Sequence, residues 1–354
     1  MKETIIYIYP KNATFIQKDI NFLSKVYNIV IPNHTWDNKF SIPLNFIKQF
    51  IFLIQNVFFC RAIFIMFGGY WSLIPSVFGK MLNIPVFIIL GGTDCVSFPS
   101  INYGNLRKPL ISFFIKWSLK LSKVLLPVDQ SLIYSRYNYY EKAENNFQGY
   151  NHFFPKISTP SKVIHNGFDP EYFINTKTEK AHNSFIVIAP VSDMIRFKLK
   201  GIDIVWALAN KFVSCSFVIV GMSQSFTNTL KKKPKNLKIY PHMSQDELKD
   251  YLFKTEFVLQ LSISEGFPNS LCEAMLCKCI PIGSSVGAIP NIINKAGYII
   301  NNSNFRYIEN EFKQITRISI NKRLELAKKA RTRIIKNFHI SKRERLFLDL
   351  IKNN

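Results

Sequence analysis

Residues 257–275 read Phe257-Val-Leu-Gln-Leu-Ser-Ile-Ser-Glu-Gly-Phe-Pro-Asn-Ser-Leu-Cys-Glu-Ala-Met275. The mostly apolar run at its start has the length of a buried strand, which we expect to end at Ser262. The turn that follows, from Glu265 to Ser270, contains Gly and Pro, and a helix is expected to begin near Ser270. A strand, a tight turn and a helix N-terminus in this order are typical of a parallel-sheet βα unit.

A helix N-terminus in this position can bind a phosphate, because its first backbone N–H groups have no partner within the helix. Here these groups belong to Asn269, Ser270 and Leu271, at the positive end of the helix dipole. Glu265 lies before the helix, and we expect Glu273 in its first turn. In a nucleoside diphosphate sugar, Glu273 could accept the ribose hydroxyls and Glu265 the sugar hydroxyls. Considered singly, each is better explained as an ordinary acid, Glu273 in the first turn of a helix and Glu265 in a solvated loop.

The rest of the chain alternates short runs rich in Ile, Val and Phe with longer amphipathic segments, the rhythm of βαβ units. In the first half we predict strands at Ile5–Tyr9, Ile63–Phe67, Val86–Leu90 and Val124–Pro127, and helices at Ile42–Phe58 and Lys108–Lys123. In the second half the predicted strands are Phe185–Ala189, Phe217–Val220, Leu237–Tyr240, Phe257–Leu261 and Ile280–Gly283. The predicted helices there are Ile202–Phe212, Gln245–Lys254, Ser270–Leu276, Ala288–Lys295, Lys322–Asn337 and Ser341–Lys352.

The length of 354 residues favours two domains. The segment Gly149–Pro170 is dense in Gly, Pro, Asn and Ser and predicts a hinge or loop region. We therefore expect an α/β protein with domains at 1–163 and 164–337, and a final helix at 338–354 that packs back on the first. Ser244 followed by Glu247 predicts a capping box.

The quoted stretch resembles the retaining GT-B glycosyltransferases of family 4, or glycosyltransferase group 1, through the E-x7-E spacing of Glu265 and Glu273 within S-E-G-F-P-N-S-L-C-E-A-M. Three further blocks are similar to that family in order and spacing: Ile164–Asp169, Lys200–Asp203 and Pro281–Ile293. The resemblance covers residues 165–300 well and the N-terminal half loosely. It implies a GT-B fold, in which two Rossmann-like doubly wound domains face a central cleft.

The resemblance also implies roles for single residues. Glu273 would bind the donor ribose, Glu265 would hold the transferred sugar, and Lys200 would neutralise the leaving phosphate in place of a metal. The other donor-binding residues implied are Gly221, Met243, Gly266, Phe267, Pro268, Asn269, Ser270 and Leu271. The family's second phosphate clamp is an arginine, for which Arg196 is the nearest candidate and Lys198 an alternative. No Asp-x-Asp motif occurs, so we expect no metal and no cofactor, with a UDP-sugar as co-substrate.

The N-terminal half departs from the family pattern at Gly91, where a histidine usually approaches the transferred sugar. Asp94, four residues after the strand Val86–Leu90, is a candidate for contact with acceptor or donor, or for loop capping. Gly69, Tyr70 and Asn166 are the other acceptor-side candidates. The usual glycine-rich loop after the first strand is also replaced, by residues 9–14.

The formal net charge is +23, with 46 basic and 23 acidic residues, which favours anionic partners. The basic residues are dispersed, so an anionic membrane fits as well as a nucleic acid. The aromatic segment Tyr134–Tyr140 lacks any accompanying nucleic-acid fold signature, and we predict a surface helix there and no nucleic-acid partner. The six cysteines, none of them in a CxxC motif, predict buried, reduced thiols and a reducing compartment.

Membrane contact is left open by the sequence. The apolar stretch Phe46–Met66 is interrupted by polar residues and is not expected to span a bilayer, and the N-terminus lacks a signal-peptide layout. The segment Lys108–Lys123 forms either a membrane-surface helix or an ordinary domain helix with a solvated lysine face. Its three lysines, Lys116, Lys120 and Lys123, share one stripe, with the apolar residues largely elsewhere. We expect a soluble or peripheral cytoplasmic protein, in the second case at the inner face of the membrane.

The function expected from these features is retaining transfer of a hexose-type sugar to a saccharide or lipid-linked saccharide, in surface polysaccharide synthesis such as capsule, O-antigen or lipopolysaccharide. Two other functions fit the same donor site. One is a GT-B nucleotide-sugar epimerase that transfers nothing, and the other is a non-catalytic nucleotide-sugar-binding module.

Overall fold

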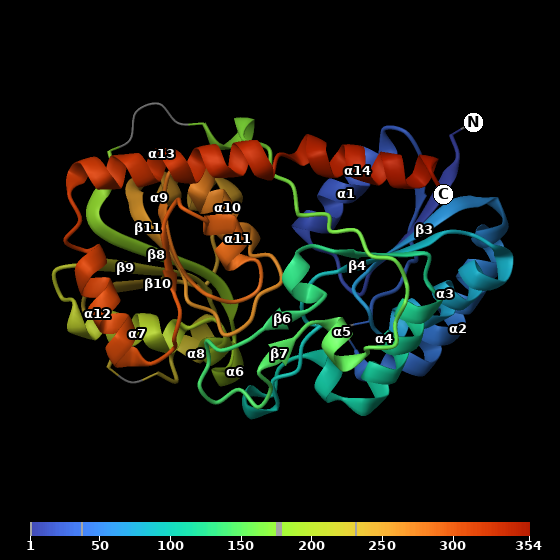
Figure 1. Cartoon of the computed structure of the whole chain (residues 1–354), viewed down its shortest axis with the longest axis horizontal. Helices are drawn as coiled ribbons and strands as arrows, with labels where there is room; N and C mark the ends of the chain where they lie inside the picture. Colours follow the sequence, from blue (N-terminus) through green and yellow to red (C-terminus); the bar gives the residue numbers. More distant parts are fainter. Residues whose placement is uncertain (1, 37, 175–178, 231) are drawn as a thin grey trace.

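The computed structural model describes residues 2–36, 38–174, 179–230 and 232–354. It contains two large parallel sheets, one in each half of the chain, with their helices around them (Figure 1). The first sheet has the order β2-β1-β3-β4-β5. Its strands are β1 (Thr4–Ile8), β2 (Asn28–Val30), β3 (Cys60–Met66), β4 (Val86–Leu90) and β5 (Val124–Pro127). The interior strands are apolar at nearly every position because helices cover both faces.

The helices of the first half are α1 (Thr14–Ser24), α2 (Ile42–Asn56), α3 (Tyr70–Leu82) and α4 (Pro109–Leu121). Helix α2 packs on α3 and α3 packs on α4, whereas α1 packs on α14 (Ile340–Lys352). A short 3-10 helix, Val57–Phe59, extends α2. By length and composition the segment Ile42–Phe59 could cross a membrane, which differs from the sequence expectation, and 22% of it is buried in the protein.

The second sheet has the order β10-β9-β8-β11-β12-β13. Its strands are β8 (Ala181–Val191), β9 (Ser216–Met222), β10 (Leu237–Tyr240), β11 (Thr255–Gln260), β12 (Ile280–Ser284) and β13 (Tyr298–Ile300). Its helices are α6 (Met194–Leu199), α7 (Ile202–Lys211), α8 (Gln224–Thr227), α9 (Gln245–Lys254), α10 (Asn269–Leu276), α11 (Ile289–Ile293), α12 (Phe305–Ile315) and α13 (Ile320–Asn337). The expected capping box forms at α9, where Ser244 and Glu247 cap each other.

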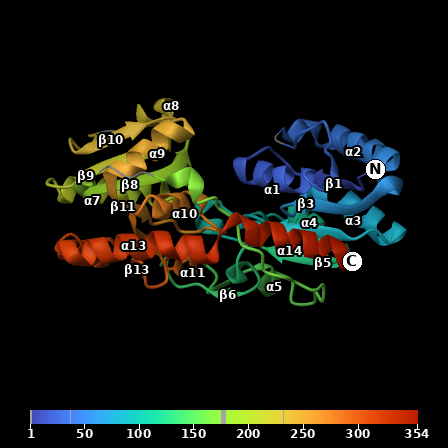
Figure 2. The ribbon, with the colours of Figure 1, turned by 90° about the horizontal axis from the view of Figure 1, so that it is seen from above.

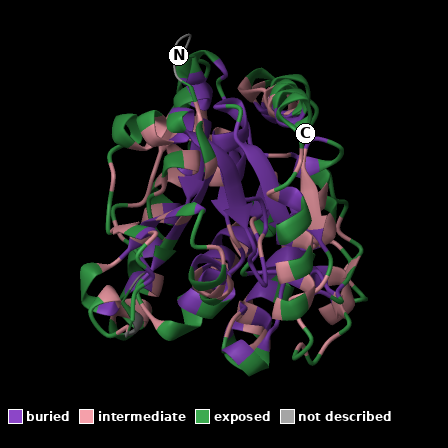
Figure 3. Cartoon of the chain, turned by 90° about the vertical axis from the view of Figure 1, so that its left-hand side faces the viewer, coloured by how far each residue is buried: buried purple, intermediate pink, exposed green. Residues whose placement is uncertain are grey.

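Aromatic side chains fill the core of the second half. The ring of Phe185 on β8 stacks on Phe217 of β9 at 5.2 Å and on Phe257 of β11 at 4.9 Å. Phe312 of α12 covers Phe185 at 4.7 Å. Figure 3 shows the buried strands running between partly exposed helices. Such interlocking rings fix the register of three neighbouring strands, and the strands position the loops at their carboxyl ends.

The segment between the sheets crosses from one half to the other. It contains the hairpin β6 (Ser135–Arg136) with β7 (Phe147–Gln148), and α5 (Tyr150–Phe153). The predicted surface helix at 134–140 is wrong, because Tyr137 and Tyr139 are buried between the halves. The Tyr137 hydroxyl donates to the carbonyl of Ile263 at 2.7 Å, and that of Tyr139 to the carbonyl of Leu261 at 3.5 Å.

Helix α14 returns from the second half to the first, in line with α13 (Figure 2). The Arg343 guanidinium, buried on α14, bonds both carboxylate oxygens of Asp19 on α1 at 2.6 Å. The same guanidinium donates to the carbonyls of Ile164 and His165 in the connecting segment. A buried ion pair in which each guanidinium nitrogen has a partner fixes the angle between α1, the connection and α14.

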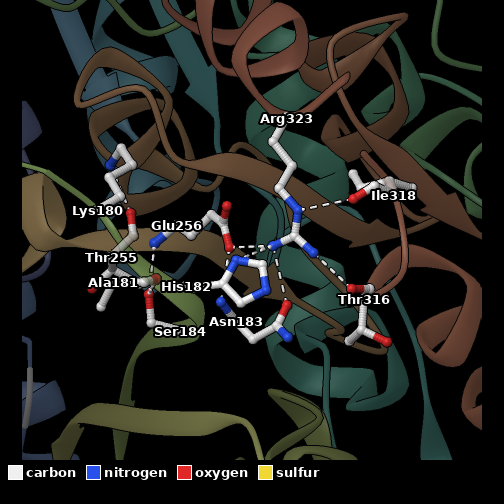
Figure 4. Close-up of polar contacts among 10 residues, drawn as sticks. All are labelled: Lys180, Ala181, His182, Asn183, Ser184, Thr255, Glu256, Thr316, Ile318 and Arg323. Carbon is white, nitrogen blue, oxygen red and sulfur yellow. Dashed lines mark hydrogen bonds and ion pairs between the residues drawn. The ribbon is translucent and has the colours of Figure 1, made fainter. Parts of the chain in front are cut away.

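A second buried ion pair anchors α13. Arg323 donates to Glu256 at the start of β11, to Asn183 and to the carbonyls of Thr316 and Ile318 (Figure 4). These contacts lie at the amino ends of the strands, away from the loops described below. All six cysteines are free, and all but Cys60 are buried, as the sequence predicts.

Candidate active site

The carboxyl ends of the two sheets meet where the loops after β4 and β11 touch. Each sheet changes winding direction near this place, between β1 and β3 and between β8 and β11, which is where doubly wound sheets bind ligands. The backbones of Gly91, Gly92 and Gly266 are in contact, since a Cβ built on Gly266 would lie 1.7 Å from the carbonyl oxygen of Gly91. No side chain larger than hydrogen fits at position 266 in this arrangement.

Glu265 lies next to this contact and is held by three donors. Its Oε1 accepts from the ammonium of Lys200 at 2.6 Å, from the Ser262 hydroxyl at 2.8 Å and from the Gln260 amide at 3.0 Å. Gln260 also donates to Ser262, which closes the network. The side chains of Glu265 and Lys200 are 11% and 20% exposed. The carboxylate is therefore fixed in one orientation, beside the loop that begins α10.

Lys200 follows α6 and brings a positive charge to this place. Burial acts to lower the pKa of the Lys200 ammonium, but Glu265 and the nearby Tyr103 outweigh burial and raise it. Tyr103 comes from the N-terminal half, and its hydroxyl lies 3.3 Å from that of Thr93. The ammonium is therefore charged throughout the physiological pH range and sits within reach of both halves.

Helix α10 begins at Asn269, one residue earlier than predicted, so Glu273 lies in its second turn rather than its first. The pKa of the Glu273 carboxyl is raised, because burial outweighs the opposing effect of Lys18 on α1. The Lys18 ammonium is 3.9 Å from Oε1 of Glu273 and 5.2 Å from the ring centre of Phe168. The first half thus places a cation beside the carboxylate that was predicted to bind ribose.

The N-terminus of α10 has no side-chain cap. Asn166 lies beside it and donates to the Asn269 side-chain oxygen at 2.9 Å, and the Asn166 Oδ1 is buried without a partner among the described residues. Ser270 donates to the carbonyl of Ile188 on β8 at 3.4 Å. The ring of Phe267, predicted only for its amide, packs against His165 at 5.6 Å. Asn166 is therefore near the predicted phosphate cradle as well as between the halves.

Two predicted clamps lie on α6. Arg196 is exposed, and its guanidinium donates to Asp193 at 2.9 Å and to Ser192 at 2.8 Å. Asp193 is the N-cap residue of α6, so the guanidinium bonds within its own helix and its N-terminal flank. Lys198 is exposed on the same helix.

Gly221 has a φ of +104° at the end of β9, and a Cβ there would lie 2.4 Å from the carbonyl oxygen of Ala189. Met243 is half-buried before α9.

Asp94 organises the loops of the first half. It is fully buried, and its carboxylate accepts the backbone N–H groups of Gly68 at 2.9 Å, Gly91 at 3.2 Å and Gly92 at 2.9 Å. Burial raises the pKa of this carboxyl despite these donors. The observed contacts of Asp94 are those of the loop-capping alternative.

The other acceptor-side candidates lie at the start of α3. Gly69 is the N-cap residue, and a Cβ there would lie 2.4 Å from the Trp71 ring. The ring of Tyr70 packs edge-on against Phe114 of α4 at 5.1 Å. Both residues are thus part of the packing between α3 and its neighbours, next to the loop that Asp94 holds.

The space beside Gly91, where the resemblance leads us to look for a histidine, is filled by another side chain. A Cβ on Gly91 would lie 1.9 Å from Cε1 of Phe67, so the Phe67 ring occupies the space that a side chain at 91 would need. Phe67 has a φ of +63°, a left-handed backbone that costs a residue with a side chain about 1–2 kcal/mol. The Phe15 ring meets it edge-on at 6.1 Å. An aromatic ring thus occupies the space beside Gly91.

Residues 195–333 match the family described as glycosyl transferases group 1. The matched segment lies wholly in the second half of the chain. It contains Lys200, Glu265 and Glu273, whereas Gly69, Tyr70, Asp94 and Asn166 lie outside it. A curated relative, the phosphatidylinositol N-acetylglucosaminyltransferase GPI3 subunit of Saccharomyces cerevisiae, is 25% identical over 146 residues. That match spans 38% of this chain and less than a third, 31%, of the relative.

Solved structures match over the full length. HepE from Anabaena, solved with UDP and glucose, has a TM-score of 0.71 at 12% identity and covers 99% of this chain and 100% of its own. Sucrose-phosphate synthase from Thermosynechococcus elongatus has a TM-score of 0.73 at 11% identity, with 99% of both chains covered. A glycosyltransferase from Rickettsia africae has a TM-score of 0.69 at 17% identity, and the match covers 99% of this chain and 98% of that one. The GT-B fold with two Rossmann-like domains is confirmed.

Sequence reasoning missed four side chains of this site. Gln260 and Ser262 carried a signal, because they are polar residues on one face of an otherwise buried strand, two positions apart. Lys18 and Tyr103 carried none, since only the docking of the two halves brings them to Glu273 and Lys200. Within the described ranges, no three His, Cys, Asp or Glu side chains gather in a way that could hold a metal ion.

Proposed function

We propose that this protein is a glycosyltransferase that moves a sugar from a nucleotide, with UDP as the expected carrier, to an acceptor hydroxyl. The observation that carries the proposal is the Lys200–Glu265 pair beside the N-terminus of α10, inside the group 1 domain. A cation, a fixed carboxylate and free backbone N–H groups suit a ligand with an anionic centre and hydroxyls around it.

In the proposed reaction the acceptor oxygen forms a bond to the anomeric carbon while the bond from that carbon to the diphosphate oxygen breaks. Both events occur on one face of the sugar, which retains the anomeric configuration, and the departing diphosphate takes the acceptor proton. Lys200 lowers the energy of this step by neutralising charge that develops on the diphosphate, without a metal. Glu265 holds sugar hydroxyls through the oxygen that its three donors leave open.

We place the ribose at Glu273, with Lys18 displaced from it or turned toward the phosphates. The acceptor is proposed to be a saccharide or lipid-linked saccharide of a surface polysaccharide, on the cytoplasmic side of the membrane. The HepE structure contains UDP and the GPI3 relative is a phosphatidylinositol glycosyltransferase subunit, and both agree with a nucleotide-sugar donor.

A thermal-shift screen of the purified chain with UDP-, GDP- and ADP-sugars tests the donor class first. We expect stabilisation by UDP-sugars, and then transfer of a radiolabelled sugar to material in membrane extract. Epimerised donor formed without an acceptor would instead indicate an isomerase. Binding of a nucleotide sugar with no turnover in any extract would indicate a binding module.

A further inference from the structure

Helix α2 has its polar and apolar faces reversed relative to an ordinary surface helix. The face buried against the protein contains two amides, Asn45 and Gln49, together with Leu53. The opposite face is apolar, and its exposed residues are Leu44, Ile47, Ile51 and Ile54. Ile47 is 58% exposed, whereas Gln49 is fully buried and donates to the carbonyl of Trp71 at 2.8 Å. A soluble surface helix normally shows the opposite arrangement.

The apolar surface continues from α2 onto α4. Phe46 of α2 stacks on Phe114 of α4 at 5.5 Å, and Phe113 meets Phe114 edge-on at 5.9 Å. Phe113 and Trp117 are exposed on α4, on the same side as Lys120, whose ammonium lies 5.0 Å from the Trp117 ring centre. The expected separation of lysine and apolar stripes on this helix is therefore wrong. Exposed apolar side chains at both ends of α2, Phe40, Phe58 and Phe59, enlarge the surface.

The charge of this region has one sign. Residues 38–128 contain nine Lys or Arg and a single acidic residue, Asp94, which is fully buried beneath the loops. Lys48 of α2, Lys116 and Lys120 of α4 are all exposed. Exposed apolar side chains with lysines around them, and no exposed acid among residues 38–128, match the chemistry of an anionic bilayer surface.

We propose that the outward faces of α2 and α4 dock on an anionic lipid bilayer, with the apolar side chains in the headgroup region and the lysines on the lipid charges. A second copy of this chain is a poor occupant, because two surfaces without acids repel each other. A spanning helix also fits poorly. Helix α2 connects β2 and β3, which both pair with β1, and its inward amides bond Thr35 and Trp71.

Vesicle co-sedimentation tests the surface with the full chain. We expect binding to vesicles of equal parts phosphatidylcholine and phosphatidylglycerol, and little binding to phosphatidylcholine alone. The double variant Ile47→Ser/Ile51→Ser should reduce the partition coefficient about tenfold or more, as should Lys116→Glu/Lys120→Glu. All four side chains are exposed, so we expect both variants to fold as the parent does. Unchanged thermal midpoints check this.

Matched variants on the far half control for general changes in hydropathy and charge. Ile320→Ser/Leu324→Ser removes two comparably exposed apolar side chains from α13, and Lys233→Glu/Lys235→Glu removes two exposed lysines. Both should bind vesicles as the parent does. Equal loss in the control and test pairs would overturn the proposal, because no particular face would then be responsible.

Three further outcomes would also overturn it. The first is failure of the parent chain to bind phosphatidylglycerol vesicles. The second is a parent dimer, seen by light scattering, that Ile47→Ser/Ile51→Ser converts to a monomer, which would assign the surface to a second copy. The third is resistance of the bound protein to alkaline carbonate extraction, which would indicate a spanning helix. Quenching of Trp117 by lipids brominated in the acyl chains, lost in Trp117→Phe, is the positive signature expected.

Discussion

The ammonium of Lys200 lies 2.6 Å from Oε1 of Glu265, although 65 positions separate the two residues in the chain. Ser262 and Gln260 hold the same oxygen, so the carboxylate keeps its orientation without the lysine. Lys200 can therefore be changed without releasing Glu265. This makes the pair the best place to separate ligand chemistry from folding.

Lys200→Ala should lower kcat by about 10²–10³, the effect of removing one group that stabilises charge in a transition state. The thermal midpoint should change little, because Glu265 retains two neutral donors. Initial-rate kinetics with the best donor measure the effect, and Lys235→Ala, an exposed lysine elsewhere in the domain, is the control. Since the pKa of Lys200 is raised, parent activity should persist to alkaline pH and fall only above the ordinary lysine value of about 10.4. A kcat within twofold of the parent would remove Lys200 from the reaction.

Glu273→Gln should stabilise the free protein and weaken nucleotide binding. Because burial raises the folded-state pKa of Glu273, the folded protein keeps a proton that the unfolded chain loses, and stability falls as pH rises through this window. Removing the charge should therefore raise the thermal midpoint at neutral pH by about 1–3 °C. The variant should bind UDP about tenfold or more weakly, since hydrogen bonds to a charged group are lost.

Two measurements separate these effects. Scanning fluorimetry near neutral pH and near pH 4 should show the stability gain only at neutral pH, because the parent carboxyl is protonated in acid. Titration calorimetry gives the UDP affinity. Unchanged affinity would mean that the ribose does not bind at Glu273, whatever the stability shows.

Asp94→Asn should destabilise the protein by about 3 kcal/mol, because an amide nitrogen would face N–H groups that now donate to a carboxylate. Urea unfolding measures this, with the exposed Asp250→Asn as control. Transfer should fall together with stability, since Asp94 supports the Gly91–Gly92 loop that touches Gly266. A drop in transfer with an unchanged free energy of unfolding would restore direct acceptor contact.

The second half was the more predictable from sequence. The strand–turn–helix at 257–275 was recognised with its boundaries shifted by one or two residues, and the predicted limits of β10 and α9 are those observed. The roles at Glu265 and Glu273 depended on a resemblance, and the family match at residues 195–333 contains both positions. Short strands such as β2 and β13, with three residues each, carry too little periodicity to be recognised.

The contacts between the halves could not be predicted. The segment Tyr134–Tyr140 has helix-compatible spacing, but its tyrosines are buried because the other half provides carbonyl acceptors for Tyr137 and Tyr139. The burial of Asp94 depends likewise on three N–H groups from two separate loops. Sequence periodicity indicates which face of an element is apolar, but it does not indicate which segment packs against that face.

Gly266→Ala tests the contact between the halves. The three atoms nearest to a Cβ at this position all belong to Gly91 and Gly92, so the methyl group meets nothing closer than these within its own domain. We expect the halves to separate slightly, seen as a larger radius of gyration in X-ray scattering. Transfer should fall and UDP affinity should be nearly kept, because the donor residues lie on one side. Unchanged scattering and transfer would show that the contact is dispensable.

The exchange of an aromatic ring for a histidine can be examined with Gly91→His and Phe67→Gly. Gly91→His alone should cost about 1–3 kcal/mol of unfolding free energy, because its Cβ would overlap the Phe67 ring. Phe67→Gly removes that ring and with it the overlap, so the double variant should be more stable than the sum of the single changes by at least about 1 kcal/mol. Urea unfolding of the four proteins gives this coupling energy. If the costs simply add, Phe67 does not occupy the place of the histidine, and another side chain must be sought for the sugar side of the site.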